Sequence, residues 1–169
     1  MRSSTGPGAP RVCVLAVVAA LAAGCGAGKH AGQTGAPVQK PPPGKVLYGG
    51  GVWAVTMRGG HAAAWHLVHG AWRAERSGPV EIDILGPHPG QKVAAIPQVA
   101  IEVKGNAPLV ETGLWVDGTE LYEKGGGLSS HEGTIYGAPA AALAPGTHTA
   151  VGYGRTAAHA FAVSWTFRV

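Results

Sequence analysis

Histidine is the residue type in this sequence that best suits metal chemistry. Imidazole nitrogens bind zinc, copper and nickel, and three or four converging rings make a site. His61, His66 and His69 are the closest group in sequence. In an extended strand His66 points away from Trp65, and His69 falls where a turn is predicted, so exposed turn histidines are the competing interpretation.

The aromatic residues offer a second kind of chemistry, because large rigid rings anchor protein and glycan contacts. The candidates for such a binding surface are Trp65, Trp72, Trp115 and Tyr122. The competing interpretation is that additional strands bury these rings.

The Asp117-Gly118 pair predicts a two-residue hairpin turn. That register pairs Val116 with Thr119 and Leu114 with Leu121, and it places Trp115 on one face with Glu120 and Tyr122.

Sequence signatures of enzymes are absent. No G-x-S-x-G, H-E-x-x-H or P-loop motif occurs, and no G-x-G-x-x-G motif follows a strand. Residues 129–132 are Ser, Ser, His and Glu, but they are adjacent in sequence, whereas triad residues come from separate segments. We therefore expect a protein that is not an enzyme and that needs no cofactor.

Cysteine and charge exclude further classes. The two cysteines are Cys13 and Cys25, so the rest of the chain can form no disulfide, Cys-ligated zinc site or cysteine nucleophile. From Val46 onward there are eight Lys and Arg against nine Asp and Glu, a net charge of −1. This balance does not predict a nucleic-acid-binding surface.

The first 24 residues have the layout of a secretory signal peptide. Arg2 and Arg11 precede an apolar run from Val12 to Ala23, which is shorter than the roughly 20 residues of a membrane-spanning helix. The run ends in LAAGC, with Leu21, small residues at 22–24, and Cys25. This ending resembles the lipobox of bacterial lipoproteins, which implies cleavage before Cys25 and a lipid on its thiol. An ordinary signal peptide is the alternative.

Residues 25–45 are rich in Gly and Pro and show no apolar periodicity. They predict a linker that begins at the lipidated cysteine. The three prolines at 41–43 favour extended polyproline II geometry, which would hold the following domain off the membrane.

The remainder of the chain predicts β-structure. Short alternating runs are separated by turn signals, and the clearest is the last, in which Phe161, Val163, Trp165, Phe167 and Val169 share one face. Residues 77–169 resemble the bacterial immunoglobulin-like and fibronectin-III-like β-sandwiches. The resemblance lies in the order VEIDILG, PQVAIEVKG, LWVDGTEL, LAPGTHTAVGYG and FAVSWTFRV.

Residues 46–76 predict a β-meander of three strands, VWAVTM, AAAWHLV and AWRAER, with His69-Gly70 as the second turn. This register puts Trp65, Leu67, Trp72 and Ala74 on one face. The meander either extends or caps the sandwich, or it forms a separate sheet with an aromatic surface.

The closing segment AAHAFAVSWTFRV also resembles that of periplasmic copper-resistance chaperones, which implies copper binding by His159. Ala157 and Ala158 stand where that family has an acidic residue.

The sequence thus predicts an all-β immunoglobulin-like antiparallel sandwich with an N-terminal meander, anchored through Cys25 on the extracytoplasmic face of the cell membrane. Its expected role is non-catalytic binding or scaffolding towards an envelope protein or glycan, without nucleic acid. The alternative is copper or zinc handling by His159, His61, His66 and His69.

Overall fold

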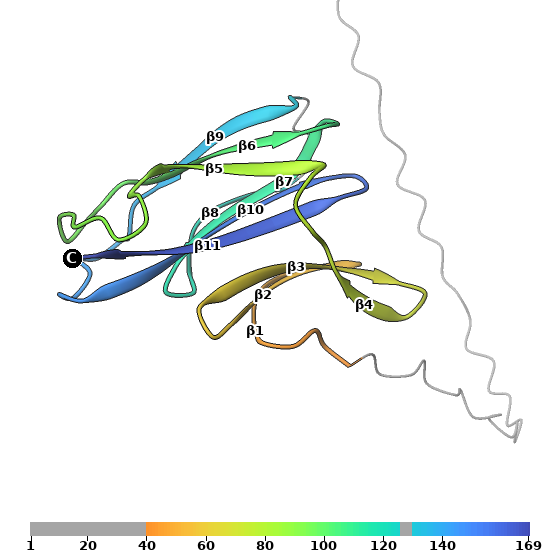
Figure 1. The fold of residues 1–169 in the computed structure, drawn as a ribbon, viewed down its shortest axis with the longest axis horizontal. Coiled ribbons are helices and arrows are strands. Elements are labelled where there is room, and N and C mark those ends of the chain that lie inside the picture. Colours follow the sequence, from red (N-terminus) through yellow and green to blue (C-terminus); the bar gives the residue numbers. More distant parts are fainter. Residues whose placement is uncertain (1–39, 126–129) are drawn as a thin grey trace, which may run out of the picture. The chain divides into compact units, whose positions relative to one another are not determined.

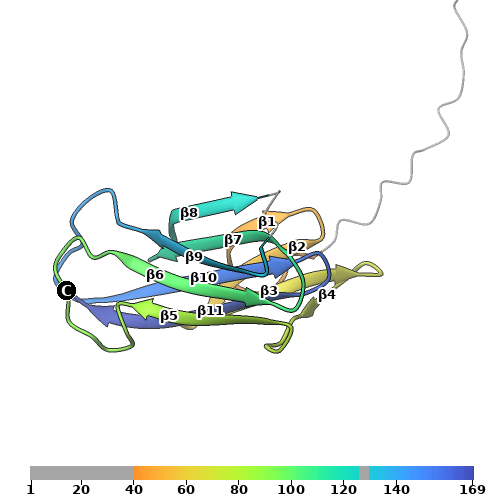
Figure 2. The same ribbon diagram turned by 90° about the horizontal axis from the view of Figure 1, so that it is seen from above.

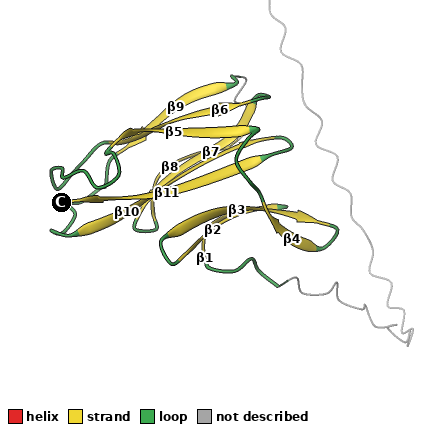
Figure 3. Cartoon of the chain, in the orientation of Figure 1, coloured by secondary structure: helices red, strands yellow, loops and turns green. Residues whose placement is uncertain are grey.

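The computed structural model describes residues 40–125 and 130–169. The predicted signal peptide, Cys25 and the linker as far as Gln39 lie outside the described residues. The described residues form strands and turns without a helix, and none of them forms a helix able to cross a membrane (Figure 3). Residues 37–169 make one compact unit. The all-β prediction is confirmed.

The strands follow one another in the order β1 (Lys45–Gly50), β2 (Trp53–Arg58), β3 (His61–Val68), β4 (Ala71–Ala74), β5 (Val80–Gly86), β6 (Val99–Gly105), β7 (Leu109–Val116), β8 (Thr119–Gly125), β9 (Glu132–Gly137), β10 (Thr147–Thr156) and β11 (Ala160–Arg168). They form three antiparallel sheets. Sheet A has the order β1-β2-β3-β4, sheet B the order β5-β6-β9, and sheet C the order β11-β10-β7-β8.

Sheets B and C face each other as an immunoglobulin-like sandwich (Figure 1). In sheet C, β7 pairs with β10, a non-consecutive pairing of the Greek-key kind. Seen from above, the long strands of the two sheets run in similar directions, as expected for aligned packing (Figure 2).

The core between sheets B and C is built from the predicted alternating faces. Val80 from β5, Val99, Ile101 and Val103 from β6, and Phe167 from β11 are each at most 1% exposed. Their neighbours in sequence are more exposed, as Glu81 is beside Val80 and Arg168 beside Phe167, so the opposite side of these strands is less buried.

Sheet A packs on the opposite face of sheet C, which makes sheet C the middle of three layers (Figure 1). Trp53 and Val55 of β2 bury against Val151 and Tyr153 of β10 in a second core. Where β3 crosses β11, the second core is lined by small side chains, which permit close approach of the two backbones: Ala62, Ala64, Ala160 and Ala162. Sheet C is therefore apolar on both faces.

Sheet A has four strands, whereas the sequence pattern predicted three. The additional strand β1 pairs with β2 through a bulge between Val46 and Tyr48. Its sequence KVLYGG has two glycines and no strict alternation, so the period-2 pattern does not reveal it. The structure combines the two arrangements left open for this segment, because it forms a separate sheet and that sheet caps the sandwich.

Both predicted two-residue turns form. His69 and Gly70 have φ of 49° and 78°, and Asp117 and Gly118 have φ of 52° and 82°, as a type I′ turn requires. Val116 pairs with Thr119 as predicted.

The predicted pairing of Leu114 with Leu121 is wrong, because an irregularity between Leu114 and Trp115 shifts the register. Leu114 pairs with Tyr122 instead.

Candidate binding surface

The outward face of sheet A carries the aromatic residues that the sequence predicted to lie together. Trp65 pairs with Ala74 and Leu67 with Trp72, so these side chains point the same way, away from sheet C. Trp65, Leu67 and Trp72 are half-buried. We call these three residues the aromatic face.

Hydrogen bonds hold the aromatic face in position. Trp65 Nε1 donates to Thr56 Oγ1 at 2.9 Å, and Thr56 Oγ1 donates to the carbonyl oxygen of Pro43 at 2.9 Å. Thr56 is 1% exposed although it lies on the outward side of β2, two residues from Ala54, which is 3% exposed.

The triple proline takes part in this surface rather than acting only as a spacer. Pro42 is buried, and Pro41 and Pro42 line a depression of about 300 Å³ with Val46, Ala54 and Trp72. A neighbouring depression of about 370 Å³ runs from Lys40 to Trp72. Composition alone could not show this, because a Pro-rich segment has the same sequence signal whether it is solvated or packed.

Trp115 is not part of any surface, and its predicted exposure is wrong. It is 1% exposed and packs beneath sheet A in the second core. The competing interpretation, burial under the N-terminal strands, is the one that the structure has. The indole lies over Gly113, where a Cβ would come within 2.1 Å of the ring.

Tyr122 also differs from its prediction. The bulge at Leu121 in β8 puts it opposite Leu114 rather than on the face of Trp115, and it is half-buried against the core between sheets B and C. Trp115 and Tyr122 therefore form no common binding surface.

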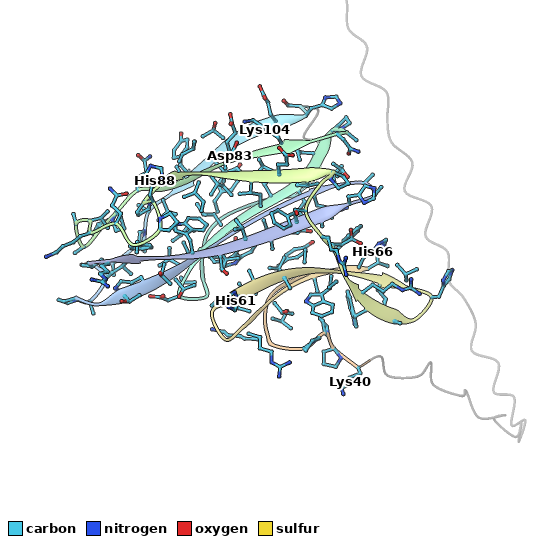
Figure 4. All side chains as sticks on the ribbon, viewed as in Figure 1. Lys40, His61, His66, Asp83, His88 and Lys104 are labelled. Carbon is cyan, nitrogen blue, oxygen red and sulfur yellow. The ribbon has the colours of Figure 1, made fainter. Side chains whose placement is uncertain are left out.

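The four candidate histidines occupy different places. His61 begins β3 (Figure 4), and His69 lies in the turn after the end of this strand, so the length of β3 separates them. His66 stacks on Trp53 with ring centroids 3.9 Å apart and an interplanar angle of 11°. His159 lies in the turn between β10 and β11.

Glu75 is the residue that relates two of these histidines. The Nδ1 of His66 is 3.8 Å from Glu75 Oε1, and the Nδ1 of His159 is 3.8 Å from Glu75 Oε2. No sequence pattern indicated this carboxylate, which follows β4. Within residues 40–125 and 130–169, no three His, Cys, Asp or Glu side chains converge in a way that could hold a metal ion.

A buried polar network joins sheets A and C. Glu111 of β7 is 6% exposed and accepts from Arg155 Nε at 2.9 Å. The hydroxyl of Tyr48 also donates to Glu111, and that of Tyr153 lies 3.4 Å from its Oε2. Burial raises the pKa of Tyr153 well above its usual value, so its hydroxyl stays protonated.

Arg155 continues the network into sheet A, because its guanidinium carbon lies 5.4 Å from the ring centroid of Trp53. A chain of contacts therefore runs from Glu111 through Arg155 and Trp53 to His66. Sequence reasoning missed Glu111, since most acidic residues on strands face solvent.

A further buried polar group, His148, connects the start of β10 to the turn at Asp117 and to the loop before β10. His148, 8% exposed, places Nδ1 2.6 Å from Asp117 Oδ2 and Nε2 2.7 Å from the carbonyl oxygen of Ala144. Both partners are acceptors, so both ring nitrogens donate in the charged imidazolium. The hydrogen bond to Asp117, together with that to Ala144, raises the pKa of His148 above its ordinary value.

Comparisons with known proteins concern the fold alone. No protein-family model matches the chain, and no curated protein matches it. Among solved structures, a lytic polysaccharide monooxygenase of Jonesia denitrificans is similar, with 21% identity and a TM-score of 0.35. The match covers 49% of this chain and 59% of the monooxygenase, less than two thirds of its length.

Proposed function

We propose that this protein is a lipoprotein of the bacterial cell envelope. Its lipid anchor at Cys25 holds it on the extracytoplasmic face of the cell membrane, and its three-layered domain acts as a non-catalytic binding or scaffolding module. The anchor is supported by the LAAGC ending of the predicted signal peptide.

The observation that carries the binding role is the aromatic face of sheet A. The inner face of this sheet is fixed on sheet C by the second core and by the network of Glu111 and Arg155. The outer face presents Trp65, Leu67 and Trp72, each half-buried, on a rigid support. Rigid aromatic side chains on a regular element are effective anchors for a partner.

The buried polar residues fit a structural role better than catalysis. The carboxylate of Glu111 is hydrogen-bonded to Arg155 and two tyrosines. The ring nitrogens of His148 are hydrogen-bonded to Asp117 and to a carbonyl oxygen. Each of these charges lies between sheets or under a loop and stabilises the contact there. An envelope protein or glycan is the partner class that the sequence suggests.

The anchor is tested by Cys25→Ala in the full chain. We expect the variant to lose the lipid mass increment seen in the wild type by intact mass spectrometry, because the thiol is the acceptor. After a high-salt wash, the variant should leave the membrane fraction while the wild type stays. A Cys25→Ala chain that keeps its lipid mass and resists the wash contradicts the proposal.

A further inference from the structure

Charge is distributed unevenly along the described chain. Residues 40–74 contain no Asp or Glu and carry four basic residues, Lys40, Lys45, Arg58 and Arg73. Residues 75–169 contain six Lys and Arg and nine Asp and Glu, a net charge of −3. The near-neutral total for the domain therefore conceals two segments of opposite sign.

The fold places the basic segment in one outer layer, sheet A, and several acidic residues of the other segment on the opposite outer layer, sheet B. Residues 40–74 build sheet A and its approach, whereas the outward side of sheet B carries acidic residues: Glu81, Asp83, Glu102 and Glu132. Lys104 pairs with Asp83 at 3.0 Å within that acidic surface. In Figure 4, Asp83 and Lys104 lie on the side of the domain opposite Lys40. Such a dipole orients a domain over a charged surface.

The outward side of sheet A combines apolar and basic groups. Val46 and Val52 are 48% and 46% exposed near the aromatic face. Arg58 is exposed on the same side, because it continues the alternation of Ala54 and Thr56 along β2. Tryptophan rings and basic side chains around a modest apolar patch are the composition of surfaces that lie in a membrane interface.

The aromatic face lies close to the start of the described chain and therefore within reach of the proposed anchor at Cys25. Lys40 lines a depression with Trp72, so the described chain begins at the aromatic face. Fourteen residues separate Cys25 from Lys40, which limits their distance to about 50 Å. A second contact within that reach acts at high effective concentration, so even a weak affinity is sufficient.

We propose that the outward side of sheet A docks on anionic lipid headgroups, with Trp72 and Val46 at the interface and Lys40 and Arg58 against the phosphates. This inference rests on the proposed function, which places the domain at a membrane, and it names anionic lipid as the partner of the aromatic face in place of an envelope protein or glycan. It differs from the spacer role predicted for the triple proline, because Pro42 is buried on the docking side. The acidic sheet B then faces away from the bilayer.

The test uses the chain 26–169, which includes the complete compact unit of residues 37–169 but lacks Cys25. Binding is measured by flotation with vesicles of phosphatidylglycerol and phosphatidylcholine, and with phosphatidylcholine alone. We expect binding only to the anionic vesicles and weaker binding as salt rises. Absence of binding to anionic vesicles, or equal binding to neutral ones, overturns the proposal.

Matched variants locate the contact. Arg58→Glu should weaken vesicle binding by at least about fivefold, and Lys92→Glu, with the same charge change in an exposed loop away from sheet A, should have a smaller effect. Trp72→Ala should weaken it, whereas Tyr136→Ala, at a 61% exposed aromatic on sheet B, should not. Equal losses in both members of either pair overturn the assignment to sheet A. Circular dichroism verifies that each variant is folded.

This assay is independent of the lipid anchor. If the chain 26–169 binds anionic vesicles while Cys25 carries no lipid, the docking surface stands and the lipoprotein proposal fails. If Cys25 is lipidated but the soluble chain ignores vesicles and is retained on envelope glycan or protein, the anchor stands and the docking proposal fails.

Discussion

Trp165 is the aromatic residue whose burial the sequence predicted most directly. It is 5% exposed, packs in the core between sheets B and C, and donates from Nε1 to the carbonyl oxygen of Pro87 at 2.7 Å. Trp165→Ala should lower the free energy of unfolding by about 3–5 kcal/mol, because it leaves a cavity and an unpaired carbonyl. Urea unfolding measures the loss. A melting temperature close to that of the wild type would contradict this burial, and Trp72→Ala, at a half-buried site, should cost less.

His148 makes stability depend on pH. Its folded-state pKa is raised by Asp117 and by the carbonyl oxygen of Ala144, so folding favours the charged form. The stabilisation is fully present below the unfolded pKa of about 6.5 and is lost as pH rises through the higher folded pKa. Asp117 is the ionised group that faces the ring, and Phe167 packs 5.7 Å away.

The measurement compares wild type with His148→Gln, which has a donor but no charge. The difference in their free energies of unfolding should be largest near about pH 5.5 and should shrink as the wild-type imidazolium loses its proton. A difference that is constant from acid to alkaline pH would show that His148 is not the titrating group.

At the level of elements, the spacing between sheets B and C depends on β10. A Cβ at Gly154 would come within 2.2 Å of Val103 Cγ1 and 3.4 Å of Val80 Cγ1. Gly154→Ala should therefore destabilise the protein by about 1–3 kcal/mol, because the branched valine cannot move aside. Gly133 of β9 is the control, since a Cβ there meets nothing within 4 Å. Equal unfolding midpoints for the two variants would contradict this packing.

Sequence patterns were most successful at predicting individual strands and turns. The alternation of β5, β6 and β11 and the turns at His69-Gly70 and Asp117-Gly118 were predicted from local residue types. Errors arose at β1 and at the bulge in β8, where the period of two is interrupted. A bulge adds one residue to one strand, so every position beyond it changes face.

For the whole molecule, the pair of Glu111 and Arg155 in sheet C joins the outer layer to the sandwich through its contacts with Tyr48 and Trp53 of sheet A. Glu111→Ala should lower the free energy of unfolding by about 3 kcal/mol, because Arg155 is left without its partner between the sheets. Urea unfolding should still show one transition, since sheet A shares a core with sheet C. Glu102→Ala, which removes an exposed partner of Lys104, should change little. A loss in Glu111→Ala no larger than in this control would contradict the role of the pair.

The sequence by itself determined the regular strands, the two tight turns and the residues that share a face in those strands. These features depend on neighbours within a few positions, where φ preferences and side-chain alternation act. The aromatic set of Trp65, Leu67 and Trp72 was predicted in this way. The export and lipidation motif stays a prediction.

Only the tertiary structure decided which faces are covered. Trp115 is buried because sheet A lies on it, and alternation cannot show whether a face meets water or another sheet. Glu111 meets Arg155 across 44 positions, and His66 shares Glu75 with His159 from a distant turn. Such contacts arise when strands distant in sequence pair and when layers stack, and stacking is set by the sum of many weak apolar contacts rather than by any local signal.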